Sequence, residues 1–366
     1  MKDVRYTQLA DVLVSYSLNV QKDESVLIDA MDMSYEIISE LVQAVTAKGG
    51  HAFVKTSSSK VVRALYLYGS LKTFEVMAET DLAFMKQMQG YISLRNYDNS
   101  FEFCDVPAEK MMSIRKIMRS VIDWRVKRTK WCVVRWPSSS MAQAASMSTE
   151  AFEDFYFKVC TMDYRRMSES SKALVALMQK TDKVRLVGPG ETDLTFSIKG
   201  IPMLSATGQN NLPDGEVFTA PVRDSANGVI CYNTPSLYEG KKYENIRLRF
   251  EKGRIVEATA SDTQAINSIF DTDEGARYVG EFAIGLNPHI TDGMCDILFD
   301  EKITGSIHFT PGSSYDDASN GNVSSIHWDL VMIQTPKYGG GKIYFDDVLV
   351  RDNGLFVIDA LKPLNP

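Results

Sequence analysis

Residues 26–54 read VLIDAMDMSYEIISELVQAVTAKGGHAFV, and this stretch decides the fold class of the first part of the chain. Residues 26–28 and 52–54 are short apolar runs typical of buried strands. Between them, Ser34 can cap a helix, and Gly49 and Gly50 can end it. Apolar residues recur along this helix at helical spacing, at Ile37, Ile38, Leu41, Val42 and Val45. The order strand, helix, strand predicts a β-α-β unit, which favours a parallel sheet.

The junction between the first strand and this helix, residues 29–34, lacks the Gly-x-Gly-x-x-Gly pattern of dinucleotide-binding folds. Without those glycines, a pyrophosphate cannot approach the backbone, and the sequence argues against a dinucleotide cofactor. Apolar periodicity predicts further helices over residues 6–18 and 111–122 and across 149–180, with a strand at 131–136.

The second part of the chain has a different pattern. From residue 183 onward, the helical period gives way to alternation of apolar and polar residues, with frequent glycine-containing turns. A length of 366 residues also exceeds one ordinary hydrophobic core. We therefore expect an α/β domain with a parallel sheet at residues 1–182 and a β-rich α+β domain at residues 183–366.

Composition excludes several classes of function. The net charge of −7 has the wrong sign for binding nucleic acid. No apolar run reaches the roughly 18 residues of a membrane span, so we expect no membrane partner. The first residues lack a secretory signal, and five scattered cysteines form no CxxC pair. These features predict a cytoplasmic protein in a reducing compartment.

Two of the four histidines, His308 and His327, lie 19 residues apart in the densest motif region of the chain. His327 and Asp329 occupy positions i and i+2 of an alternating segment, residues 325–331, so an extended strand would point both side chains to one face. Such a pair can bind one metal ion. The alternative is a histidine that is hydrogen-bonded to a neighbouring carboxylate on a sheet surface.

Three further acids belong to the same region. Glu301 precedes His308, with Gly305 allowing a turn between them. Glu216 and Glu281 stand in apolar segments, where a carboxylate is costly unless it has a partner. Metal binding would supply that partner. The alternatives are ion pairs with an arginine such as Arg223 or Arg277, or edge-strand acids that face water.

Four carboxylates and two imidazoles are ligands that suit Zn²⁺, Co²⁺ or Mn²⁺, and six ligands fit two divalent ions better than one. The predicted metal ligands are Glu216, Glu281, Glu301, His308, His327 and Asp329. In two-metal hydrolases, the ions share a nucleophile and stabilise the developing oxyanion. Tyr315 offers a neutral phenol as a further donor to that oxyanion, unless it is an ordinary tyrosine of a surface loop.

Four sequence strings in this order resemble a known family: GEVFTAP (215–221), DEGARYVGEFAIG (273–285), DEKITGSIH (300–308) and SIHWDL (325–330). They are similar to the thermophilic metalloprotease family of aminopeptidases. The resemblance implies an α/β N-terminal domain, a β-rich C-terminal domain with a two-metal centre, and a homodimer that encloses the active site. It assigns the metal to the same six residues and the catalytic role to Tyr315.

The leading hypothesis is a metallo-aminopeptidase that hydrolyses short peptides with a free N-terminus. One alternative is a ring-cleaving dioxygenase with a single non-haem Fe(II), because a pyridine-ring dioxygenase resembles the same family and two histidines and one carboxylate suffice for its triad. The additional acids Glu216 and Glu281 argue against that alternative. A second alternative is a peptide-binding module without catalysis. The number of metal ions per chain would discriminate among the three.

Overall fold

The computed structural model describes residues 3–238 and 240–366, which form two compact units. The first unit holds the chain up to Met162 together with Gly208–Leu212, and the second holds Asp163–Thr207 and Pro213–Pro366. This division places helix α8 (Tyr164–Met178) in the second unit, whereas the sequence-based limit lies near Asp182. The limits of the folding domains at 1–182 and 183–366 stay a prediction.

The sheet of the first unit is parallel throughout, in the strand order β2-β1-β3-β4-β8. The predicted β-α-β unit is confirmed, since β1 and β2 pair in parallel register from Ser25 opposite His51 to Met31 opposite Ser57. The strands are β1 (Ser25–Met31), β2 (His51–Ser57), β3 (Gly90–Arg95), β4 (Lys130–Arg135) and β8 (Asn211–Leu212).

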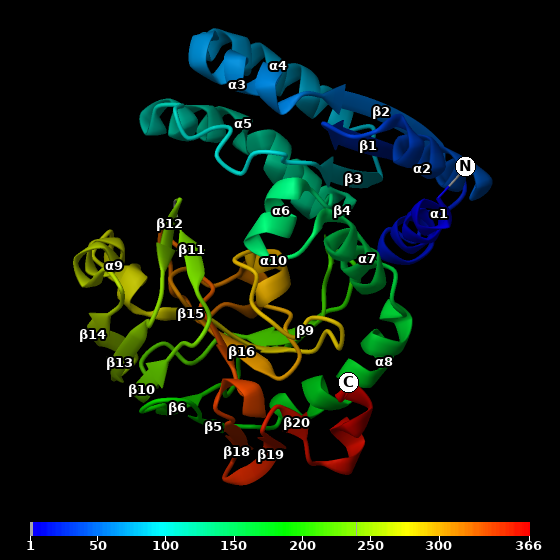
Figure 1. The fold of residues 1–366 in the computed structure, drawn as a ribbon. Coiled ribbons are helices and arrows are strands. Elements are labelled where there is room, and N and C mark those ends of the chain that lie inside the picture. Colours follow the sequence, from blue (N-terminus) through cyan, green and yellow to red (C-terminus); the bar gives the residue numbers. More distant parts are fainter. Residues whose placement is uncertain (1–2, 239) are drawn as a thin grey trace. The chain divides into compact units, whose positions relative to one another are not determined.

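Helices cover this sheet (Figure 1). They are α1 (Val4–Asp11), α2 (Tyr35–Ala47), α3 (Ser59–Tyr68), α4 (Leu71–Met85), α5 (Ala108–Arg128), α6 (Ser139–Ala144) and α7 (Thr149–Cys160). The prediction of one regular helix over residues 6–18 is wrong in one respect. A π-helix, η1 (Val12–Ser17), forms the second half of this segment. The apolar residues Leu9 and Leu13 are buried on both sides of this change.

The second unit is built mainly from antiparallel strands, which confirms the predicted β-rich fold class. One sheet has the order β14-β13-β10-β6-β5-β18-β19-β20, and another has the order β17-β16-β15-β9-β7. The strands of the first are β5 (Lys183–Val187), β6 (Asp193–Ser197), β10 (Asn227–Cys231), β13 (Arg247–Glu251), β14 (Arg254–Thr259), β18 (Lys342–Phe345), β19 (Val348–Asp352) and β20 (Leu355–Phe356). Those of the second, which we call the site sheet, are β7 (Leu204–Ala206), β9 (Glu216–Thr219), β15 (Val279–Gly285), β16 (Ser306–Pro311) and β17 (Val331–Ile333).

Smaller elements complete the second unit. They are a hairpin of β11 (Ser236–Tyr238) and β12 (Lys241–Tyr243), helices α9 (Thr263–Phe270) and α10 (Ile297–Asp300), and the 3-10 turns η2 (Glu274–Arg277), η3 (Asp316–Ala318), η4 (Pro336–Tyr338) and η5 (Asp359–Leu364). Within the described residues, no helix combines the length and the apolar composition that crossing a bilayer requires. All five cysteines, each of them described, are free thiols.

Phenylalanine side chains join the two large sheets of this unit. Phe196 of β6 lies 4.9 Å, between ring centroids, from both Phe282 of β15 and Phe309 of β16. Phe250 of β13 adds a contact at 5.5 Å with Phe309. All four rings are buried, so one face of the site sheet belongs to the hydrophobic core.

We expect Phe196→Ala to lower the free energy of unfolding of the second unit by about 3–5 kcal/mol, because a large cavity would open between the sheets. Urea unfolding followed by circular dichroism measures the change. Leu355→Ala, at a half-exposed position of the same sheet (49% exposed), serves as the control and should stay within about 0.5 kcal/mol of the parental chain. Equal effects of the two changes would contradict the proposed role of the aromatic contact.

Candidate metal centre

The site sheet carries the hydrophobic core on one face and polar residues on the other. In the pairing of β9, β15 and β16, Ala283 lies opposite both Phe218 and His308, and Gly285 lies opposite Glu216. Because side chains alternate along a strand, Glu216, Glu281 and His308 share one face, and their neighbours in sequence point into the core. Ala283 and Gly285 are the small residues of β15 on this face, next to the charged side chains.

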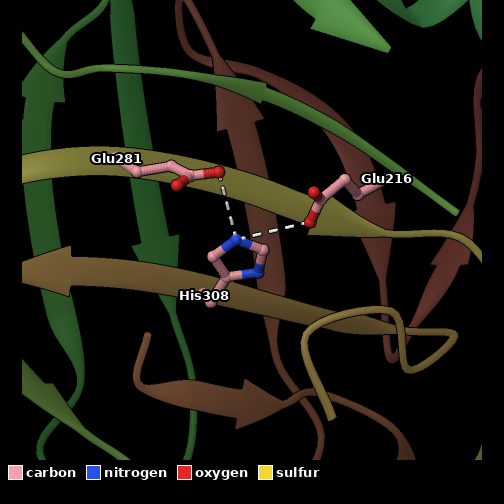
Figure 2. Close-up of side chains that lie close together, drawn as sticks. All are labelled: Glu216, Glu281 and His308. Carbon is pink, nitrogen blue, oxygen red and sulfur yellow. Dashed lines mark hydrogen bonds and ion pairs between the residues drawn. The ribbon is translucent and has the colours of Figure 1, made fainter. Parts of the chain in front are cut away.

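His308 lies between two carboxylates on this face, as Figure 2 shows. Its Nε2 atom is 3.4 Å from Oε2 of Glu216 and 3.4 Å from Oε1 of Glu281. All three residues are buried, with exposed fractions of 6% or less. Neither Oε2 of Glu216 nor Nδ1 of His308 has a hydrogen-bond partner among the described residues.

His327 and Asp329 approach the same cluster from the segment that precedes β17. Nε2 of His327 is 3.3 Å from Oε2 of Glu281 and 3.2 Å from Oδ1 of Asp329. Nδ1 of His327 must carry the ring proton, because it lies 2.8 Å from the carbonyl oxygen of Ser313, which can only accept. This bond leaves Nε2 available as a ligand atom.

The structure corrects the prediction of a strand over residues 325–331. This segment is irregular up to β17 except for one bridge, between Gly312 and His327. The indole of Trp328 packs away in the core, stacked on Tyr238 with ring centroids 4.6 Å apart. His327 and Asp329 both lie near Glu281 even without a regular strand, because backbone hydrogen bonds align the segment with residues 309–313 and the indole between them points into the core.

The predicted ligand Glu301 joins the cluster from the turn after α10. One carboxylate oxygen of Glu301 and one possible ligand atom each of His308 and Asp329 all lie within 4.8 Å of one another. Two similar groups are Glu216, Glu281 and His308, and Glu281, His327 and Asp329. The structure therefore brings together all six of the residues that the sequence predicted as metal ligands.

Lys302 is a member of this cluster that the sequence analysis missed. Its Nζ atom is 2.5 Å from Oε1 of Glu216, 2.6 Å from Oε1 of Glu301 and 3.4 Å from Oδ1 of Asp214. Burial alone would lower the pKa of this ammonium, but the carboxylates raise it well above its usual value. Its one sequence signal was its place beside Glu301 in the string at residues 300–308.

The arginines considered as alternative partners of the buried acids bind elsewhere. Arg223 donates to Asn322 at 3.1 Å and contacts Glu274 at 3.4 Å. Arg277 pairs with Asp271 at 2.7 Å. Glu216 pairs with Lys302 instead, and Glu281 faces the two histidines.

The cluster favours additional positive charge at its centre. Burial raises the pKa of Glu216 to about 8, in spite of the nearby Lys302 ammonium. Although burial lowers the pKa values of the imidazoles, Glu216 raises that of His308 to about 9, and Asp329 raises that of His327 to about 12. A divalent cation supplies the charge that this arrangement attracts. Carboxylate oxygens and imidazole nitrogens, some without hydrogen-bond partners, are a donor set that fits such a cation.

Tyr315 lies next to His327, with ring centroids 4.8 Å apart, and also contacts Phe218 at 5.9 Å. About half of Tyr315 (51%) is exposed to solvent, but its hydroxyl is shielded from water. This shielding, followed by the charges of Glu281 and Asp329, raises the pKa of the hydroxyl well above the usual value. The hydroxyl therefore stays protonated and can donate a hydrogen bond.

Comparison with known proteins identifies a family for this chain. The model of the thermophilic metalloprotease (M29) family matches residues 2–343. The chain belongs to this family. Aminopeptidase T of Thermus thermophilus is 40% identical over 119 residues, which are 31% of this chain and 29% of that protein. The matched part thus spans less than a third of that relative's length.

Two solved structures are similar along nearly the whole chain. Wild-type AmpT from Thermus thermophilus has a TM-score of 0.81 at 22% identity, covering 97% of this chain and 99% of its own. The 2,5-dihydroxypyridine dioxygenase from Pseudomonas putida has a TM-score of 0.60 at 12% identity, covering 97% and 98%. At these identities, the likeness establishes the fold alone.

Position 285 on β15 requires glycine, because the backbone of the turn at Lys302 and Ile303 lies directly against it. A Cβ atom at Gly285 would lie 2.3 Å from the carbonyl oxygen of Ile303 and 2.6 Å from Oγ of Ser306. We expect Gly285→Ala to displace this turn and lower the free energy of unfolding by about 1–3 kcal/mol, measured by urea unfolding. An unchanged midpoint would mean that the turn moves aside without cost.

Proposed function

We propose that this chain is a metal-dependent aminopeptidase that hydrolyses N-terminal residues from short peptides, with two divalent ions at the cluster of Glu216, Glu281, Glu301, His308, His327 and Asp329. Family membership supports a divalent metal and a peptide substrate. The names of relatives such as aminopeptidase T support removal of residues from the N-terminus.

The orientation of Glu281 carries this proposal. Its Oε1 atom faces His308 at 3.4 Å, and its Oε2 atom faces His327 at 3.3 Å. A carboxylate that presents one oxygen to each of two imidazoles is suited to bridge two ions. Glu216 and His308 would complete the ligands of one ion, and His327 and Asp329 those of the other. Glu301 lies near His308 and Asp329.

When bound, the ions supply Lewis acidity that polarises a peptide carbonyl and lowers the pKa of water. The protein's own groups orient the ligands. Thr310 donates to Oδ1 of Asp329 at 2.8 Å, and the carbonyl oxygen of Ser313 accepts from Nδ1 of His327. Tyr315, whose ring packs against the imidazole of His327, would donate a hydrogen bond from its hydroxyl to the oxyanion that develops as the peptide carbonyl is attacked.

The dioxygenase alternative requires two histidines, one carboxylate and open positions on a single iron. This cluster has additional carboxylates that such a site does not need. Oε2 of Glu216 is buried without a hydrogen-bond partner among the described residues, an expensive arrangement unless a cation binds there. The acid-rich donor set therefore supports the hydrolase over the iron enzyme, and a complete ligand set argues against a binding module without catalysis.

The remaining features of the proposal come from three sources: the family resemblance for the dimer, the cysteine pattern for the location, and the donor set for the metal. We propose a homodimer that encloses the active site, a cytoplasmic location, and Zn²⁺, Co²⁺ or Mn²⁺ as the metal. Enclosure would favour short peptides over folded proteins. Light scattering measures the oligomeric state, and a monomer with full peptidase activity would remove enclosure as the cause of size selection.

We expect the purified chain to bind two divalent ions and to hydrolyse leucyl peptides, but not their N-acetylated forms. A chelator should abolish hydrolysis, and Zn²⁺, Co²⁺ or Mn²⁺ should restore it. His327→Ala should lose metal and activity, because it removes a ligand atom that faces two carboxylates. Elemental analysis and a peptide-release assay measure these outcomes. One iron per chain, with oxygen uptake on a dihydroxypyridine, would instead establish the dioxygenase.

Tyr315→Phe tests the oxyanion role, since it keeps the ring and removes only the hydroxyl. We expect kcat to fall about 10²- to 10³-fold with a much smaller change in KM, because the bond matters chiefly in the transition state. Metal content and the unfolding midpoint should not change. Tyr68→Phe, at a position that is 85% exposed in the first unit, is the control and should keep the parental rate. A fully active Tyr315→Phe enzyme would leave oxyanion stabilisation to the ions alone.

A further inference from the structure

Lys302 occupies an unusual position for a lysine. Only 1% of the residue is exposed, and its ammonium faces three carboxylates, those of Glu216, Glu301 and Asp214. Two of these residues are proposed metal ligands. An ammonium buried among carboxylates that belong to a metal cluster suggests a role for Lys302 in shaping that cluster.

The two oxygens of the Glu216 carboxylate have different partners. Oε1 binds the ammonium at 2.5 Å, whereas Oε2 faces Nε2 of His308 at 3.4 Å. The ammonium thus holds Oε1 away from the centre and aims Oε2 at it. Glu301 also gives one oxygen to Lys302, at 2.6 Å.

Hydrogen bonds hold the backbone of Lys302 on both sides of its side chain. Its N–H donates to the carbonyl oxygen of Phe299 at 3.0 Å, and its own carbonyl oxygen accepts from the N–H of Asn287 at 2.9 Å. The adjacent Ile303 packs directly on Gly285. A side chain that starts from so rigid a backbone can hold two carboxylates in defined orientations.

We infer that Lys302 is a positioning residue for the metal centre, which orients Glu216 and Glu301 as one-oxygen ligands and offsets their mutual repulsion. The inference rests on the proposed function, because it presumes that the cluster binds metal. It also predicts an asymmetry. Lys302 contacts Glu216 and Glu301, which each belong to a group with His308. It contacts no member of the third group, which consists of Glu281, His327 and Asp329.

A purely structural ion pair is the competing explanation. Under that explanation, loss of Lys302 would destabilise the second unit without changing how tightly the folded chain binds metal. Arg351 offers a matched control, since it is also a cation that is 1% exposed in the same unit. Its guanidinium donates to the carbonyl oxygen of Ser306 and to Oε1 of Gln334, and neither partner is a predicted metal ligand.

The experiment measures zinc and cobalt binding to the full chain and to Lys302→Met, Lys302→Arg and Arg351→Met. Ions per chain come from elemental analysis, dissociation constants from competition with a chelator, and ligand geometry from the absorption spectrum of bound Co²⁺. Thermal unfolding is recorded for each variant. Peptidase activity is not needed as a readout.

We expect Lys302→Met to weaken the binding of one ion by 10- to 100-fold, the usual effect of losing a partner that orients a metal ligand, while the second ion stays bound. The Co²⁺ spectrum should change, and Lys302→Arg should recover part of the affinity because it keeps a cation. Arg351→Met should unfold at a lower temperature yet bind both ions as the parental chain does.

Unchanged dissociation constants in folded Lys302→Met would overturn the inference in favour of a structural ion pair. Tighter binding would also overturn it, since Lys302 would then be competing with the metal for Glu216. If Lys302→Met does not fold, Lys302→Arg decides: weaker binding of one ion with a changed Co²⁺ spectrum supports the inference, because a guanidinium holds the two carboxylates in a different geometry, and parental affinity with a parental spectrum overturns it. A parental chain that binds no divalent ion would refute the proposed function itself, which is a different outcome from parental binding that Lys302 does not affect.

Discussion

Mutual repulsion among buried carboxylates is the constraint on which the second unit depends. Five acids, Asp214, Glu216, Glu281, Glu301 and Asp329, converge in a volume that largely excludes water. An isolated charge in such surroundings costs several kcal/mol, so the cluster must include cations. One buried lysine and two imidazoles supply part of the compensating charge, and metal ions held by the predicted ligands would supply the rest.

The strands that carry this cluster also carry the core. Along β15, Glu281 points to the polar face, whereas Phe282 and Ile284 point into the core between the sheets. A shift of one residue in the pairing would bury the carboxylate among phenylalanines and expose the aromatic rings. Packing of Phe196 against Phe282 and Phe309 therefore maintains the strand register that brings Glu216 and His308 together.

Sequence periodicity was sufficient for the β-α-β unit, because its helix and strands are long and strongly patterned. Glu216 and Glu281 could be selected because acids flanked by apolar residues need partners, although their meeting depends on strand pairing over 65 residues of chain. Lys302 could not be recognised in the same way. A lysine beside a glutamate in a polar turn has the local pattern of an exposed ion pair, and only its neighbours in space reveal that it is buried. For the same reason, the two-residue strand β8 leaves no periodic signal.

The short strand β8 has a consequence for how this protein can be divided. Gly208–Leu212 lies in the middle of the second unit's sequence, yet β8 pairs with β4 in the sheet of the first unit. The chain therefore passes from one unit to the other three times, at Met162, Thr207 and Leu212. No single cut yields two complete units, and a fragment that ends at residue 182 would leave the outer edge of β4 without its partner. Unpaired sheet edges invite association with other chains. Evolution by simple loss or exchange of either half is correspondingly restricted, since the first unit is completed only by a segment that the chain reaches after it has begun the second.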